Sequence, residues 1–175
     1  MKNVYFILFG FAMAAGIFAA AGFYPMATIG FSVITRREWK KAEHAAEKFY
    51  NTQNLKLGIG PVDFSRSENA TLKRGIERES LTALIESELM QQAGEQEFSD
   101  FDSRVEERVD SATRGKKTLE RAATLSYGLN AKDFQRLILV PQARLEVLTD
   151  HITKKGVDFM DWFENFRQSK KIRLF

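Results

Sequence analysis

The hydrophobic and polar residues of this chain divide it into two unequal parts. Residues 4–24 form one nearly unbroken apolar run with a single charged side chain before it, Lys2, whereas the chain from Arg36 onward is polar and amphipathic. At about 1.5 Å of rise per residue, a helix of this length spans the ~30 Å hydrocarbon layer of a bilayer. The pattern therefore predicts a membrane anchor over residues 1–28 and a separate body over residues 29–175.

A cleaved signal peptide is the alternative to the anchor. Such a peptide has a shorter apolar core, about 7–15 residues, and ends at a small-x-small site, which the alanines at 19–21 could provide. The length of the run favours a retained, single-pass anchor. Small residues at positions 12, 16 and 20 could let two anchors pack together, which would make a homodimer.

The apolar residues of the body recur mostly at helical spacing, which predicts an all-α, mainly helical domain. Thr35 followed by Glu38 is a capping box and predicts the start of the first helix. The short, partly β-branched stretch 29–34 just before it predicts a strand. The glycines and proline within residues 51–63 predict a loop after the helix.

Further along, glycines and capping residues predict where the other helices begin and end. A long helix is predicted over residues 67–93, with Gly94 as the residue that stops it. Asn130 is a good N-cap for a later helix, which Gly156 ends. Pro141 lies inside that helix and should kink it, because its ring clashes with the preceding turn.

The last part of the body is the most aromatic. Four residues at i, i+3, i+4 and i+7 predict a helix with an aromatic face: Phe159, Trp162, Phe163 and Phe166. Such a face either packs on the core or stays open to bind another molecule. Residues 172–175 alternate in polarity, so we expect a short strand that pairs with 29–34 and turns Ile172 and Leu174 inward.

Composition narrows the class of protein. The body is long enough for one hydrophobic core but not comfortably for two domains. The net charge is +3 in 175 residues and the chain has no cysteine, which excludes disulfides and thiolate metal sites. Acidic and basic residues alternate along the predicted helices rather than gathering on one face, so nucleic acid is not an expected partner.

The chain shows no set of residues suited to catalysis. Its two histidines, His44 and His151, lie on different predicted helices without a second histidine one turn away. No serine has the G-x-S-x-G spacing of a nucleophile elbow, and Gly58-x-Gly60 lacks the further glycine of a phosphate loop. We therefore expect no enzyme activity, no metal and no cofactor.

Three motifs in order resemble the N-terminal chaperone domain of SurA, PpiD and related periplasmic foldases. They are residues 34–39 (ITRREW), residues 84–93 (LIESELMQQA) and residues 127–134 (YGLNAKDF). The resemblance covers about residues 29–152. One departure is Gly30-Phe31, where the family usually has Asn-Gly, which makes a hairpin at this place less secure.

The resemblance implies an activity as well as a fold. Members of this family hold extended, unfolded chains in an apolar cradle without ATP, and they usually carry a prolyl isomerase domain with active-site histidines. The few residues after Ile152 contain no histidine, so the resemblance implies a chaperone part without isomerase activity. It also implies a bacterial protein, anchored in the cytoplasmic membrane, whose body lies on the extracytoplasmic side.

The expected partners are then unfolded or nascent exported polypeptides, together with the lipid bilayer through residues 4–24. A holding chaperone needs adaptable apolar surface, and five residues are the candidates for it: Met90, Phe159, Trp162, Phe163 and Phe166. The alternative is a structural or adaptor protein that docks one folded partner through its aromatic C-terminal helix.

Overall fold

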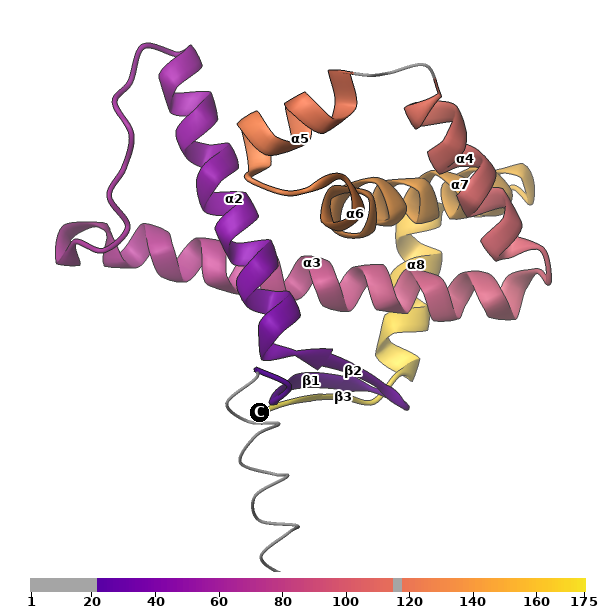
Figure 1. The fold of residues 1–175 in the computed structure, drawn as a ribbon. Helices are drawn as coiled ribbons and strands as arrows, with labels where there is room; N and C mark the ends of the chain where they lie inside the picture. The colour runs from indigo at the N-terminus through magenta and orange to yellow at the C-terminus, as the bar shows by residue number, and fades with distance from the viewer. Residues whose placement is uncertain (1–21, 115–117) are drawn as a thin grey trace, which may run out of the picture.

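The computed structural model describes residues 22–114 and 118–175, and Figure 1 shows their arrangement. The elements in chain order are β1 (Pro25–Ile29), β2 (Ser32–Thr35), α2 (Arg36–Lys56), the 3-10 turn η1 (Ser67–Asn69), α3 (Ala70–Glu97), α4 (Phe101–Thr113), α5 (Thr118–Tyr127), α6 (Ala131–Phe134), the π-helical turn η2 (Gln135–Leu139), α7 (Val140–Lys154), α8 (Phe159–Ser169) and β3 (Ile172–Leu174). The body is mainly helical, with one small sheet. Most of the predicted anchor, including the alanines at 19–21, lies outside the described residues.

Within the described part of the chain, no helix combines the length and the apolar character needed to cross a bilayer. Helix α3 is the longest element, and it runs across the whole molecule in Figure 1. Helices α2 and α7 both pack on it, α5 packs on α2, and α4 packs on α7. The sheet lies at one end of this assembly, below the helices in the view of Figure 1.

The sheet corrects the predicted strands. Residues 29–34 are not one strand, because Gly30 has a φ of 60° and reverses the chain between β1 and β2. Glycine adopts this left-handed conformation without the clash that a Cβ atom would cause. Residues 25–28, which the hydrophobic pattern assigns to the anchor, form most of β1.

The C-terminal strand pairs as an edge strand of this antiparallel sheet, whose order is β2-β1-β3. Its partner is β1 rather than the whole of 29–34, and Ile29 lies opposite Ile172. Ile172 is half-buried, as the alternation predicts. Leu174 lies opposite Ala27, on the inner side of the sheet as the alternation predicts, but it is 67 % exposed, because it lies at the end of an edge strand, past the last helix.

The start of α2 is confirmed and its end is later than predicted. The Thr35 hydroxyl accepts from the Glu38 amide and the Glu38 carboxylate accepts from the Thr35 amide, which completes the capping box. The helix continues through residue 51 to Lys56. There the Asn51 side chain bonds both the N–H and the C=O of Val62, so the helix itself holds the returning loop.

The predictions for Gly94 and Pro141 have different outcomes. Gly94 does not stop α3, which continues to Glu97; Gly94 lies where the ring of Phe101 crosses the helix. Pro141 lies inside a helical run from residue 131 to residue 154, as predicted, and the regular helix is interrupted by a π-helical turn directly before it. Asn130 is confirmed as an N-cap, because its side-chain oxygen accepts from the Asp133 amide.

Three clusters of buried side chains make up the core of the described body. One joins α3, α4, α7 and α8 around Phe101 and Leu148. A second joins the inner face of the sheet to α3 around Leu89. A third joins α2, α5 and α6 around Phe134. The first two share half-buried aromatic residues of α8, so the last helix ties the helices to the sheet.

An apolar groove between the helices as candidate site

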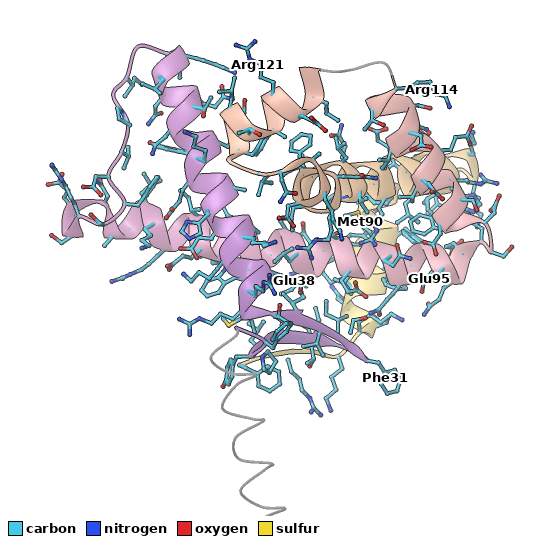
Figure 2. All side chains as sticks on the ribbon, viewed as in Figure 1. Phe31, Glu38, Met90, Glu95, Arg114 and Arg121 are labelled. Atoms are coloured by element: carbon cyan, nitrogen blue, oxygen red, sulfur yellow. The ribbon has the colours of Figure 1, made fainter. Side chains whose placement is uncertain are left out.

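The five residues predicted to bind a client do not form one open surface. Met90 and Phe159 are buried in the core, and Figure 2 shows Met90 inside the helical body. The other three, Trp162, Phe163 and Phe166, are half-buried against the core. They also pack on one another: Phe159 stacks on Phe163 with 5.7 Å between ring centroids, and Trp162 on Phe166 with 6.0 Å. The aromatic face of α8 therefore serves mainly to close the core.

The open apolar surface lies elsewhere, in a groove of about 310 Å³ between α2, α3, α5 and the η2–α7 junction. We call it the interhelical groove. Its walls are mainly apolar, and the lining residues are Ala42, Ala45, Ala46, Phe49, Ile76, Glu79, Ser80, Ala83, Leu84, Tyr127, Leu137, Ile138 and Pro141.

Small side chains on α2 create this space. Ala42, Ala45 and Ala46 stand at i, i+3 and i+4, so they share the face of α2 that turns toward α3. A methyl group fills little of the gap between two crossing helices. The wall that α2 contributes is thus apolar and leaves open space beside it. Larger residues at these positions would have filled the groove.

The opposite wall comes from the irregular backbone before α7. Leu137 and Ile138 belong to the π-helical turn, in which the Val140 amide bonds the Gln135 carbonyl. Pro141 follows directly and has no amide to donate, so a regular α-helical bond back to residue 137 cannot form. Short π-helical turns of this kind occur frequently at functional sites. Here the turn supplies two apolar side chains to the groove.

Aromatic residues close one end of the groove. The rings of Phe49 on α2 and Tyr127 on α5 stack with 4.8 Å between their centroids, and Tyr127 also contacts Phe134 at 5.3 Å. Burial raises the pKa of the Tyr127 hydroxyl above its usual value of about 10. The hydroxyl therefore stays neutral at physiological pH and adds no charge to the apolar wall.

One polar atom in the groove has no partner. The Ser80 side chain is 7 % exposed, and its hydroxyl makes no hydrogen bond to any described residue. Leaving a buried hydroxyl unpaired costs about 1–3 kcal/mol. A hydroxyl can both donate and accept, so Ser80 is suited to bond a backbone amide or carbonyl that enters the groove.

A second, polar cavity lies on the surface between α4 and α7 and measures about 370 Å³. Its central arginine is already paired: Arg108 bonds both Glu146, at 3.1 Å, and Asp150, at 3.0 Å. In the described ranges no three His, Asp or Glu side chains come together in a way that could hold a metal ion. The interhelical groove is thus the better candidate for a binding site.

Sequence reasoning missed this groove. The spacing of Ala42 and Ala46 is that of an apolar stripe on one helix face, but a stripe alone does not say whether the facing side chains fill the space. The signal that could have revealed the groove is the small size of these side chains. Three alanines on one face of a helix leave space unfilled where that helix crosses another.

No protein-family model, no curated protein and no solved structure matches this chain. The resemblance to the SurA and PpiD foldases therefore rests on its three motifs alone and stays a prediction.

Proposed function

We propose that this protein is a membrane-anchored, ATP-independent chaperone module that holds apolar segments of unfolded polypeptides in the interhelical groove. The observation that carries this proposal is an open apolar groove with one buried, unpartnered hydroxyl. The motif resemblance and the apolar run at residues 4–24 support the same function. By that resemblance the body works outside the cytoplasmic membrane of a bacterium, on exported chains, without isomerase activity.

The size of the groove fits side chains of an extended segment better than the surface of a folded protein. Its volume of about 310 Å³ is at the lower end of the ~300–1,000 Å³ typical of ligand pockets. Burying one large apolar side chain contributes about 1.5–3 kcal/mol. Two such side chains, less the cost of ordering the segment, give weak binding with fast release, which is what holding a folding chain requires.

The Ser80 hydroxyl would let the groove recognise the main chain of a client rather than a particular side chain. Every peptide unit of an extended segment offers an N–H and a C=O. A single hydroxyl at the wall of an apolar groove bonds either group whatever the sequence of the segment. Such recognition suits many clients rather than one.

The adaptor alternative gains less support. It needs the aromatic face of the last helix to be open, whereas Phe159 is buried and Trp162 and Phe163 pack on the core. A folded partner would have to use the exposed side of α8, where Met160 is the large apolar residue.

Cross-linking of the full chain tests the groove directly. The chain has no cysteine, so A83C or T82C carries the only attachment point for a photo-reactive maleimide. Ala83 lines the groove, and its exposed neighbour Thr82 does not. We expect an unfolded client to cross-link at position 83 and much less at 82. Equal labelling at both positions would contradict the proposal.

A matched pair of charge variants tests the holding activity. A83E places a carboxylate at the groove, while T82E adds the same charge to the same helix outside it. We expect the wild-type chain and T82E to slow aggregation of an unfolded client at equimolar amounts, and A83E to do so much less. If the wild-type chain leaves aggregation unchanged, or A83E matches T82E, the groove is not a client site.

A further inference from the structure

The outer face of the sheet presents apolar side chains that no described element covers. Along β1, Ala27 and Ile29 are fully buried against the helices, so the alternate residues face away from the body. Val33 on β2 and Arg173 on β3 lie beside Thr28 on that outer face. Both Val33 and Arg173 are exposed.

Large apolar residues gather around this face. Phe31 stands at the tip of the hairpin and is fully exposed, and Figure 2 shows it pointing away from the body. The others come from the segment before β1, from β2 and from the C-terminal residues. Together with Phe31 the set, which we call the sheet patch, consists of Phe23, Tyr24, Val33 and Phe175, all between 45 % and 59 % exposed apart from Phe31.

The two chain segments that carry the sheet patch hold charges of one sign. Residues 22–37 and 170–175 hold five basic side chains and no acidic one: Arg36, Arg37, Lys170, Lys171 and Arg173. None of the five lies within ion-pair distance of a carboxylate in the described parts of the chain, although Arg37 lies over the Phe23 ring and Lys170 over the Phe166 ring. Elsewhere in the body, basic side chains such as Lys41, Arg108 and Lys155 pair with acidic ones.

We infer that the sheet patch lies on the surface of an anionic lipid bilayer, so that the folded body contacts the membrane directly and is not merely tethered to it. Aromatic side chains are enriched at the level of lipid headgroups, and lysine and arginine beside them are attracted to anionic lipids. The patch combines both features.

The position of the patch in the chain selects this partner over a protein. The apolar run ends at residue 24, and β1 begins at Pro25. A run that spans the bilayer therefore delivers the sheet to the interface with no linker between them. The inference rests on the proposed anchor and is independent of client binding in the groove, which lies on the far side of α3 from the sheet.

Spin labels on the full chain in lipid nanodiscs test the contact. F31C places the only cysteine at the hairpin tip, and L57C places it at the opposite end of α2, where Leu57 is also exposed. In discs with one quarter phosphatidylglycerol, we expect the label at 31 to be more accessible to oxygen than to a water-soluble nickel chelate. The label at 57 should show the reverse, as in water.

A charge reversal with a matched control tests the electrostatic part. K171E/R173E changes the patch, and K132E/K154E makes the same change in net charge at exposed lysines away from the sheet. In the F31C background, the first pair should return the label at 31 toward aqueous accessibility and the second should leave it in lipid. Discs of phosphatidylcholine alone should also weaken the contact.

Four results would overturn the inference. They are a water-like label at position 31 in the anionic discs, equal effects of the two charge reversals, spin–spin broadening that places position 31 against a second copy, and failure of the full chain to enter the discs. Failure to enter the discs would also contradict the proposed anchor. A water-like label at position 31 would leave the proposals for the anchor and the groove unaffected. Cross-linking at position 83 reports on the groove separately.

Discussion

Gly94 in α3 and Phe101 in α4 are in such close contact that no side chain fits between them. A Cβ atom added at Gly94 would lie 2.5 Å from Cδ1 and from Cδ2 of the Phe101 ring. That ring is 1 % exposed and belongs to the cluster that joins four helices. The glycine thus sets how closely α4 approaches α3.

Gly94→Ala should lower the free energy of unfolding by about 1–3 kcal/mol, because the added methyl group overpacks a rigid core. This loss exceeds the ~1 kcal/mol by which alanine is favoured over glycine in a helix. Urea denaturation followed by circular dichroism measures it. Gly75→Ala is the control, since Gly75 lies in the same helix with open space around it. It should gain about 0.5–1 kcal/mol. A stabilised Gly94→Ala would contradict the close packing.

Ser80→Ala should change stability and client binding in opposite directions. Removing the unpartnered hydroxyl should raise the free energy of unfolding by about 1 kcal/mol, while the loss of the bond to a client backbone should weaken cross-linking at position 83. Ser87→Ala in the same helix is the control. The Ser87 hydroxyl lies 3.0 Å from Nη1 of Arg144 and accepts its hydrogen bond, so this variant should lose about 1 kcal/mol. Equal stability changes in the two variants would show that Ser80 is paired.

The stability of the body should fall as His151 becomes protonated. Burial against Phe98, whose ring lies 4.3 Å away, lowers the pKa of His151, and Lys155 lowers it further. The unfolded chain then binds the proton more readily than the folded one. The contribution of neutral His151 is therefore present above about pH 6.5 and is lost as the pH falls below that value.

Unfolding free energies measured from about pH 7.5 to about pH 5.5 test this dependence. His151→Gln cannot take up the proton, so its stability should vary less with pH than that of the wild-type chain. His44→Gln replaces the other histidine, whose side chain is 75 % exposed, and controls for the loss of an imidazole. If the pH dependence of stability disappears in His44→Gln but persists in His151→Gln, the effect comes from His44 and the prediction is wrong.

Asp133→Asn should destabilise the junction between α2 and α6. The Lys41 ammonium donates to both carboxylate oxygens of Asp133, at 2.9 and 2.8 Å, and this bond lowers the pKa of Asp133 below its usual value. Losing it should cost about 1 kcal/mol in urea denaturation. Asp150→Asn breaks a more exposed pair with Arg108 and should cost less than about 0.5 kcal/mol. Equal costs would show that burial of the Lys41 pair adds nothing.

The features that the sequence predicts well are those whose partners are close along the chain. The capping box of Thr35 and Glu38 and the cap of Asn130 on Asp133 each join residues three positions apart. Both are therefore visible in a short window of sequence. The same holds for the helical spacing of the α8 aromatic residues, which the structure confirms as a helix.

The features that fail depend on backbone conformations and side-chain contacts that a short motif does not specify. Gly94 is a residue type that often ends helices, and only its contact with the Phe101 ring shows that its role is close packing between α3 and α4. Gly30 hides a turn inside what looks like one apolar stretch. The groove draws its walls from residues between Ala42 and Pro141, so no single motif describes it. Whether the α8 aromatic face is open or covered likewise depends on how α3 and the sheet meet it.

The pairing of β3 with β1 also affects the order of folding. Ile29 and Ile172 are neighbours in the sheet, yet nearly the entire body separates them along the polypeptide. The β1–β2 hairpin is local and can form while the chain is still emerging from the ribosome, but the third strand of the sheet is synthesised only after all the helices between them. Closing such a long loop carries a large entropic cost and is slow. Until it closes, β1 presents an unpaired edge to any neighbouring chain.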